Sequence, residues 1–119
     1  MVTLFGWASL GRVKYGSDVY DNDFIVSTFN EVFPRDCDDE HLVDREELER
    51  SIDDKTKVIM IGTGNYGVLK VSRDARRYCK KNKIELVSKS TPVIIQEYNM
   101  KMKRKGRKPN ITAIIHVRC

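Results

Sequence analysis

The chain has 119 residues, of which 40% are hydrophobic and 33% are charged, and its formal net charge is +5. This length predicts a single domain over residues 1–119, large enough to bury one core without disulfides or a metal. The composition excludes a disordered chain, and no apolar run reaches the ~18–20 residues that span a bilayer. No basic residue precedes Arg12, so we expect no targeting peptide, no membrane insertion and a cytoplasmic location.

The charges are divided between the two halves of the chain. Residues 1–60 hold 7 Lys and Arg against 14 Asp and Glu, a net charge of −7, while residues 61–119 hold 15 against 3, a net charge of +12. Such a division polarises the surface if the halves stay apart in space, and it can serve a partner or pair one half against the other. The three cysteines are widely spaced, which predicts free thiols in a reducing compartment.

The first third of the chain is predicted to be β-structure. Residues 12–15 alternate polar and apolar, residues 16–18 form a turn, and residues 23–27 are β-branched and aromatic. These segments predict two strands of an N-terminal antiparallel β-hairpin or meander. Pro34 ends this unit, because proline cannot join a central ladder.

Helices and strands then alternate. A short helix is predicted over 44–52, with Asp44 as its N-cap and Glu47 as the capping-box partner. The continuous apolar run 57–61 predicts a strand buried on both faces. After it come a helix over 72–82 capped by Ser72, a strand over 84–87, a helix that begins with Thr91 as N-cap and Pro92, and a strand over 111–117. The order, an N-terminal unit, a helix and then β-α-β-α-β, predicts an α/β fold with a mixed, mainly parallel sheet.

The strand 57–61 runs into Gly62-Thr63-Gly64-Asn65-Tyr66-Gly67, which has the glycine spacing of dinucleotide-binding loops. Two features depart from that motif. Residues 68–71 separate the last glycine from the next helix, and Ser88-Lys89-Ser90 stands where an acidic residue would bind the ribose. Lys89 suits only a ribose phosphate, so the pattern favours a glycine turn at a strand end over a dinucleotide site.

The same loop still predicts the place of a site, because the carboxyl ends of parallel strands share one edge of a sheet. We expect a cleft at this edge to be lined by Gly62, Thr63, Gly64, Tyr66, Gly67, Lys89, Thr91 and His116. His116 and Cys119 are the base and the nucleophile that could meet there, but residues three apart on a strand point to opposite faces. No catalytic residue is therefore assigned, and the cofactor is left open.

Two charged segments stand outside this edge. Residues 37–41, Cys-Asp-Asp-Glu-His, combine metal-ligand types, but no second ligand cluster accompanies them, so we interpret them as a solvated acidic loop and assign no metal site. The segment 101–108 holds six basic residues, Lys101, Lys103, Arg104, Lys105, Arg107 and Lys108. This basic patch predicts nucleic-acid or acidic-partner binding, unless it is a solvated helix end where cations favour the helix dipole.

A set of landmarks in a fixed order carries a family likeness over nearly the whole chain. The set consists of Gly16, Tyr20, Asp23, Arg35, His41, residues 61–64 and 69–71, Thr91-Pro92, Tyr98-Asn99, residues 114–116 and Cys119. With it the chain resembles the small Mth-domain family, which includes archaeal and bacterial single-domain proteins, the adipogenesis-associated Mth-domain protein and a mitochondrial respiratory complex I assembly factor. The resemblance implies a three-layer α/β fold around a mixed sheet and no established enzyme activity. The chain departs from the family at Phe33-Pro34 and in a more basic loop at 101–110.

We therefore expect a non-enzymatic binding or assembly domain with a cleft at the carboxyl edge of its strands and a protein partner or an unidentified small ligand. Two alternatives stay open. One is a small-molecule or phosphate-ligand binding protein with weak enzyme activity, and the other is nucleic-acid binding through the segment 101–108.

Overall fold

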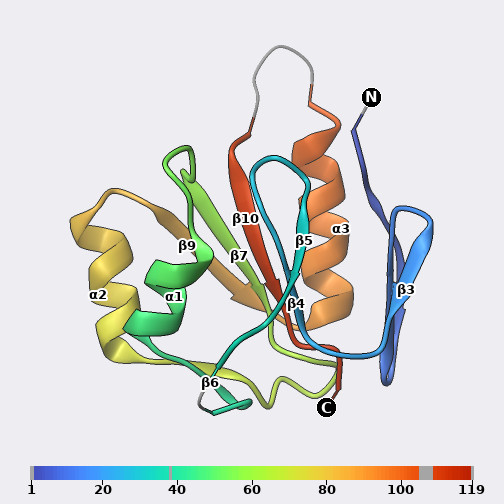
Figure 1. Ribbon diagram of the computed structural model, residues 1–119, viewed down its shortest axis with the longest axis horizontal. Helices are drawn as coiled ribbons and strands as arrows, with labels where there is room; N and C mark the ends of the chain where they lie inside the picture. Colours follow the sequence, from blue (N-terminus) through green and yellow to red (C-terminus); the bar gives the residue numbers. More distant parts are fainter. Residues whose placement is uncertain (1, 38, 105–108, 119) are drawn as a thin grey trace.

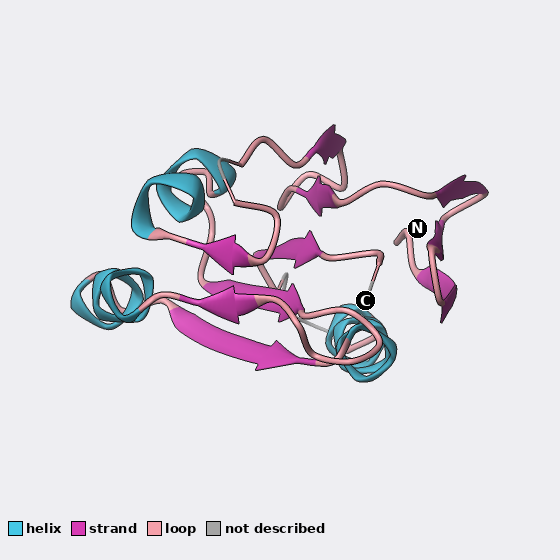
Figure 2. Cartoon of the chain, turned by 90° about the horizontal axis from the view of Figure 1, so that it is seen from below, coloured by secondary structure: helices cyan, strands magenta, loops and turns pink. Residues whose placement is uncertain are grey.

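The computed structural model describes residues 2–37, 39–104 and 109–118. They fold around a five-stranded main sheet in the order β5-β4-β10-β7-β9. Its strands are β4 (Phe24–Val26), β5 (Val32–Pro34), β7 (Val58–Gly62), β9 (Glu85–Lys89) and β10 (Ile111–Ile115). Helices α1 (Arg45–Ser51) and α2 (Arg73–Lys81) lie on one side of the sheet, and α3 (Thr91–Met102) lies on the other (Figures 1 and 2). Within the described residues, no helix is both long and apolar enough to cross a membrane.

The main sheet is mixed, as predicted for an α/β fold, but it is not mainly parallel. β10 and β9 run parallel to β7, whereas β4 is antiparallel to β10 and β5 is antiparallel to β4. A short turn between β4 and β5 allows only an antiparallel pair, whereas the helical connections around β7 produce the parallel part. Pro34 lies on β5, at the edge of the sheet, where a missing N–H donor is tolerated.

A second, three-stranded antiparallel sheet contains β1 (Phe5–Ser9), β2 (Arg12–Tyr15) and β3 (Asp18–Tyr20). The predicted meander therefore exists, but the pairing of residues 12–15 with 23–27 is wrong. β2 pairs with β1 and β3, whereas β4 is buried at every position and joins the main sheet. The Asn99 side chain on α3 accepts a hydrogen bond from Phe5 N (2.9 Å) and donates one to Phe5 O (2.8 Å), which attaches this small sheet to the helix.

Each face of the main sheet has its own core. On the α3 side, Met60, Ala113 and Ile115 pack with Ile94 and Tyr98 and with the inner face of the small sheet. On the α1/α2 side, the alternate strand residues Ile59, Ile61 and Ile114 pack with side chains from both helices, including Leu48, Ala75 and Cys79. This alternation explains why residues 58–61 of β7 are all apolar, since both faces of the strand are covered.

The helix starts are partly as predicted. Asp44 and Ser72 occupy the N-caps of α1 and α2, where their side chains accept hydrogen bonds from Glu47 N (2.8 Å) and Ala75 N (3.0 Å). Thr91 is not the cap of α3. Ser90 takes that position without a side-chain bond, and Thr91 is the first helical residue. Its hydroxyl is therefore available to the loops at the end of the strands.

Candidate functional site

The carboxyl edge of the main sheet brings the predicted loops together. His116 N donates to Gly62 O (2.9 Å), and the Thr91 hydroxyl donates to His116 O (2.8 Å) while accepting from Gly64 N (2.9 Å). One threonine therefore connects the end of β10, the glycine loop and the start of α3. Two further short strands, β6 (Leu42–Val43) and β8 (Lys70–Val71), pair in parallel and connect the segments on either side of this edge.

The glycines are explained by backbone packing. A Cβ on Gly62 would lie 2.8 Å from Thr91 Oγ1, well inside contact distance. Gly64 and Gly67 have φ values of +94° and +69°, a region that side chains disfavour. The loop then leads into β8 and not into a helix, so its N–H groups are not backed by a helix dipole as in a dinucleotide site.

The other predicted cleft residues have different surroundings. The Thr63 hydroxyl donates to Lys89 O (3.1 Å), whereas the Lys89 ammonium bonds to Glu97 on α3 (2.7 Å). Tyr66 projects from the glycine loop with 76% of its surface exposed, and Val68 is 38% exposed. The loop thus presents an aromatic and an aliphatic side chain to solvent.

His116 follows β10 and lies opposite Asp23, because the strand register pairs Ile115 with Phe24. Its Nδ1 lies 2.7 Å from Asp23 Oδ2, and Val117 N donates to Asp23 Oδ1 (2.8 Å). An ionised carboxylate only accepts hydrogen bonds, so Nδ1 carries the proton, and in the neutral ring Nε2 is an acceptor. His116 is 2% exposed, and within the described part of the chain Nε2 has no hydrogen-bond partner.

Arg35 is the hub of the same cluster. Its Nε and Nη2 bind Glu47 in a bidentate pair (2.6 and 3.0 Å), and Nη1 binds Asp23 (2.8 Å). The remaining N–H groups donate to the Glu40 carbonyl (2.7 Å) and the Leu42 carbonyl (2.9 Å). All five N–H donors of the guanidinium are therefore used within the chain.

The electrostatics of the cluster favour a permanently charged Arg35. Burial acts to lower its pKa, but the hydrogen bonds and charge of Glu47, followed by the hydrogen bond to Asp23, outweigh burial and raise the pKa. Burial raises the pKa of the Glu47 carboxyl, and the guanidinium opposes this shift. The prediction that the Glu47 side chain completes a capping box is therefore wrong. Its carboxylate instead binds Arg35 and holds α1 against the sheet edge.

His41 and Cys37 complete the surroundings. The His41 ring lies edge-on to His116, with ring centroids 5.7 Å apart. Cys37 is partly buried, and burial raises the pKa of its thiol. Among the described residues, no three His, Cys, Asp or Glu side chains converge on one point that could hold a metal ion, and Asp38 and Cys119 lie outside those residues.

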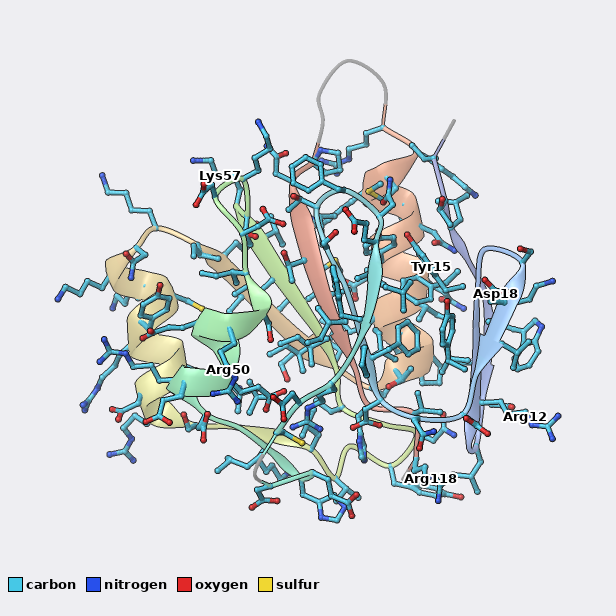
Figure 3. The ribbon with its side chains drawn as sticks, in the orientation of Figure 1. Arg12, Tyr15, Asp18, Arg50, Lys57 and Arg118 are labelled. Atoms are coloured by element: carbon cyan, nitrogen blue, oxygen red, sulfur yellow. The ribbon has the colours of Figure 1, made fainter. Side chains whose placement is uncertain are left out.

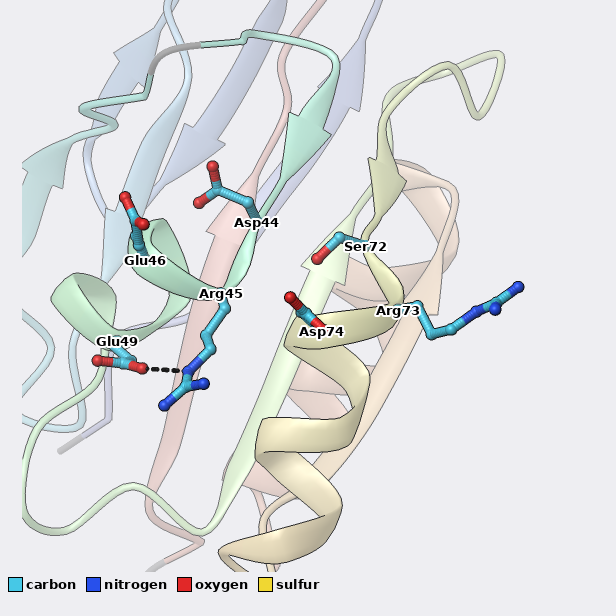
Figure 4. A pocket seen from close by; sticks show the side chains of 7 residues that line it. All are labelled: Asp44, Arg45, Glu46, Glu49, Ser72, Arg73 and Asp74. Atoms are coloured by element: carbon cyan, nitrogen blue, oxygen red, sulfur yellow. Dashed lines mark hydrogen bonds and ion pairs between the residues drawn. The ribbon is translucent and has the colours of Figure 1, made fainter.

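A groove of about 580 Å³ lies elsewhere, between the starts of α1 and α2 (Figure 4). Four of the side chains that line it have structural partners. Asp44 and Ser72 cap their own helices, and Arg45 pairs with Glu49 at 2.6 Å. The groove is open and polar, and nothing in its geometry directs these groups toward a common ligand.

The predicted basic patch is only partly visible. Lys101 lies in the last turn of α3, Lys103 is its C-cap, and Arg104 follows. Lys105, Arg107 and Lys108 lie outside the described residues. α3 ends at the side of the sheet where β10 begins, and His116 follows the other end of β10, so the two predicted features are separate surfaces (Figure 1).

The fold recurs in solved structures of small α/β proteins. The conserved hypothetical protein PH1505 from Pyrococcus horikoshii OT3 matches with a TM-score of 0.82 at 24% identity, over 97% of this chain and 98% of its own. A protein named MT938 matches with a TM-score of 0.79 at 26% identity, over 99% and 100% of the two chains. An outer membrane protein from Bartonella henselae matches with a TM-score of 0.71 at 18% identity, over 96% and 92%.

These likenesses place the chain in a class of small proteins with a mixed α/β fold. No curated protein matches it. The model of the DUF498 family, described as proteins of unknown function (DUF498/DUF598), matches residues 6–115, and the chain belongs to this family.

Proposed function

We propose that the chain is a single, cytosolic, non-enzymatic binding or assembly domain that docks a protein partner at the carboxyl edge of its main sheet. One observation carries this proposal. The charged groups of the edge are engaged within the chain, while the glycine loop exposes Tyr66 and Val68 beside them. Tyrosine is enriched in protein interfaces, where its ring supplies contact area and its hydroxyl a hydrogen bond.

The use of Arg35 supports docking over catalysis. A guanidinium that clamps a substrate phosphate or carboxylate needs free N–H groups, whereas those of Arg35 bind Glu47, Asp23 and two carbonyls. The cluster therefore serves to hold the loops that frame the docking face. The three-layer Mth-domain likeness, with its assembly proteins, fits this role.

Photo-crosslinking tests the docking face. Benzoylphenylalanine is placed at position 66 and, as a matched control, at position 100, because Tyr66 and Met100 are similarly exposed (76% and 70%). We expect one discrete adduct from position 66 in extracts of the native host and none of that mass from position 100. The same adducts from both positions, or none from position 66, would overturn the proposal.

A small ligand is the second candidate, because His116 Nε2 is buried without a partner in the described residues and is an acceptor when the ring is neutral. Such an atom fits a ligand that carries an N–H or O–H donor. His116→Asn tests this site, since the asparagine amide can keep the bond to Asp23 while Nε2 is removed. In thermal-shift assays with amines, alcohols, nucleotides and inorganic phosphate, the candidate predicts a rise in Tm for one donor class that is lost in His116→Asn. A rise that is unchanged in the variant, or no rise with any compound, would count against it.

A further inference from the structure

The amino-terminal edge of the main sheet, opposite the candidate site, gathers cations from three segments of the chain. We call this surface the basic edge. It consists of Lys55 and Lys57 before β7, Lys80, Lys81 and Lys83 at the end of α2, and Lys101, Lys103 and Arg104 at the end of α3.

These segments are neighbours in space. Lys57 accepts a backbone hydrogen bond from Glu85 (3.0 Å) at the start of β9, and donates one to Asn110 (2.9 Å) before β10. β7 begins directly after Lys55 and Lys57. The helices α2 and α3 both end at the side of the sheet where β7 begins (Figure 1). Lys57 points outward there (Figure 3).

The positive charge of the basic edge is not neutralised by ion pairs. None of its eight cations pairs with a carboxylate among the residues that the structure describes, although Arg45, Arg77 and Lys89 elsewhere do pair. Helix dipoles favour cations at the ends of α2 and α3. They do not explain Lys55 and Lys57, which precede a strand.

Lys83 occupies a position at the C-terminal cap of α2 where glycine is the favoured residue. Ile84 N bonds to Cys79 O (2.8 Å) and Lys83 N to Lys80 O (3.3 Å), the pattern of a Schellman cap. The central residue of this cap is Lys83, with φ at +58°. Residues with a side chain disfavour this left-handed backbone region, which glycine adopts freely.

We propose that the basic edge binds the phosphate backbone of nucleic acid without reading its sequence, a function separate from docking at the carboxyl edge. Seven of the eight cations are lysines, which act on phosphates as point charges and lack the fork that reads guanine. Lysine is depleted at protein–protein interfaces, whereas phosphate backbones are bound by rows of Lys and Arg. Stable membrane attachment requires apolar insertion in addition to basic charge.

Fluorescence anisotropy with a labelled DNA duplex of about 20 base pairs tests the proposal. The edge variant is Lys57→Glu with Lys83→Glu. The matched control is Arg12→Glu with Arg118→Glu, which changes the net charge equally at two exposed residues far from Lys57 (Figure 3). A third variant, Lys83→Gly, removes one cation from a position where glycine relieves backbone strain.

We expect the wild-type affinity to fall steeply with salt, and the edge variant to lose about one unit of the log–log slope per lysine while the control keeps the slope. Lys83→Gly is expected to bind more weakly despite unfolding at a higher temperature. Equal losses in the edge and control variants would overturn the proposal, because net charge alone would then explain binding. Tighter binding to phosphatidylserine vesicles or to polyglutamate than to DNA, with the same variant pattern, would also overturn it in favour of a membrane or an acidic protein.

Discussion

Replacing the Arg35–Glu47 pair by apolar residues should cost less than breaking it. The Arg35 side chain is 0% exposed and that of Glu47 is 2% exposed, and their bonds measure 2.6 and 3.0 Å. Removing one partner of a buried pair leaves the other charge unpaired and costs about 3–5 kcal/mol. We expect Arg35→Met to be the worse single change, since it abandons the carboxylates of both Glu47 and Asp23.

The double variant Arg35→Met/Glu47→Met tests this reasoning by urea unfolding of all four proteins. The sum of the single losses should exceed the loss in the double variant by at least about 2 kcal/mol, since the double variant has no stranded Glu47 charge. The free energy of unfolding of a domain of this size is about 5–15 kcal/mol in total. Because a single variant can lose much of it, the single variants are measured at low temperature. The control cycle uses Arg45 and Glu49, whose bond is also 2.6 Å but whose side chains are 58% and 42% exposed; there we expect no resolvable coupling. Additivity of Arg35 and Glu47 within about 0.5 kcal/mol would refute the account of a buried, mutually dependent pair.

Three further predictions concern single residues. Gly62→Ala places a Cβ 2.8 Å from Thr91 Oγ1 and should destabilise the fold by about 1–3 kcal/mol in urea unfolding; an unchanged midpoint would contradict the close approach. Lys83→Gly should stabilise it by about 0.5–1 kcal/mol, because φ is positive there, and a lower Tm would contradict the cap geometry. Burial alone would raise the pKa of Asp53, but hydrogen bonds from Thr28, Lys55 N and Thr56 outweigh it and lower the pKa. A carboxyl group whose pKa is lowered by folding stabilises the fold at pH values above its unfolded-state pKa of about 3.9. This stabilisation is lost as the pH falls through the folded-state pKa. Asp53→Asn should therefore lower Tm at neutral pH, and the difference should shrink below about pH 4; a difference that is constant with pH would contradict the prediction.

Local signals in the sequence were sufficient for the elements that they define. Asp44 and Ser72 sit at the caps that their side chains favour, and the strand predicted over 57–61 corresponds to the buried strand β7, which begins and ends one residue later. The partner of β4 was not predictable in this way. The apolar residues of β4 are compatible with a strand in the small sheet or in the main sheet. Its place in the main sheet depends on pairing with β10, which lies about ninety residues away in the chain.

The meeting of the strand ends and their loops at one edge could be predicted from the sequence, whereas the charged cluster beside them could not. The parallel strands placed Gly62, Thr91 and His116 at one edge because their order along the chain determines which ends meet. Asp23, Arg35 and Glu47 come from three other segments, and no local spacing links them. If the pairing of β4 with β10 is known, its register predicts that Asp23 lies opposite His116, because Phe24 pairs with Ile115.

Among the buried side-chain nitrogens and oxygens of the residues that the structure describes, His116 Nε2 has no hydrogen-bond partner, whereas Nδ1 of the same ring is held by Asp23. Long-range ¹H–¹⁵N NMR correlation of the His116 imidazole, recorded at a pH where the ring is neutral, tests this claim most directly. The account predicts one fixed tautomer, with the proton on Nδ1 and none on Nε2. A proton on Nε2, or a ring that averages between the two tautomers, would contradict it.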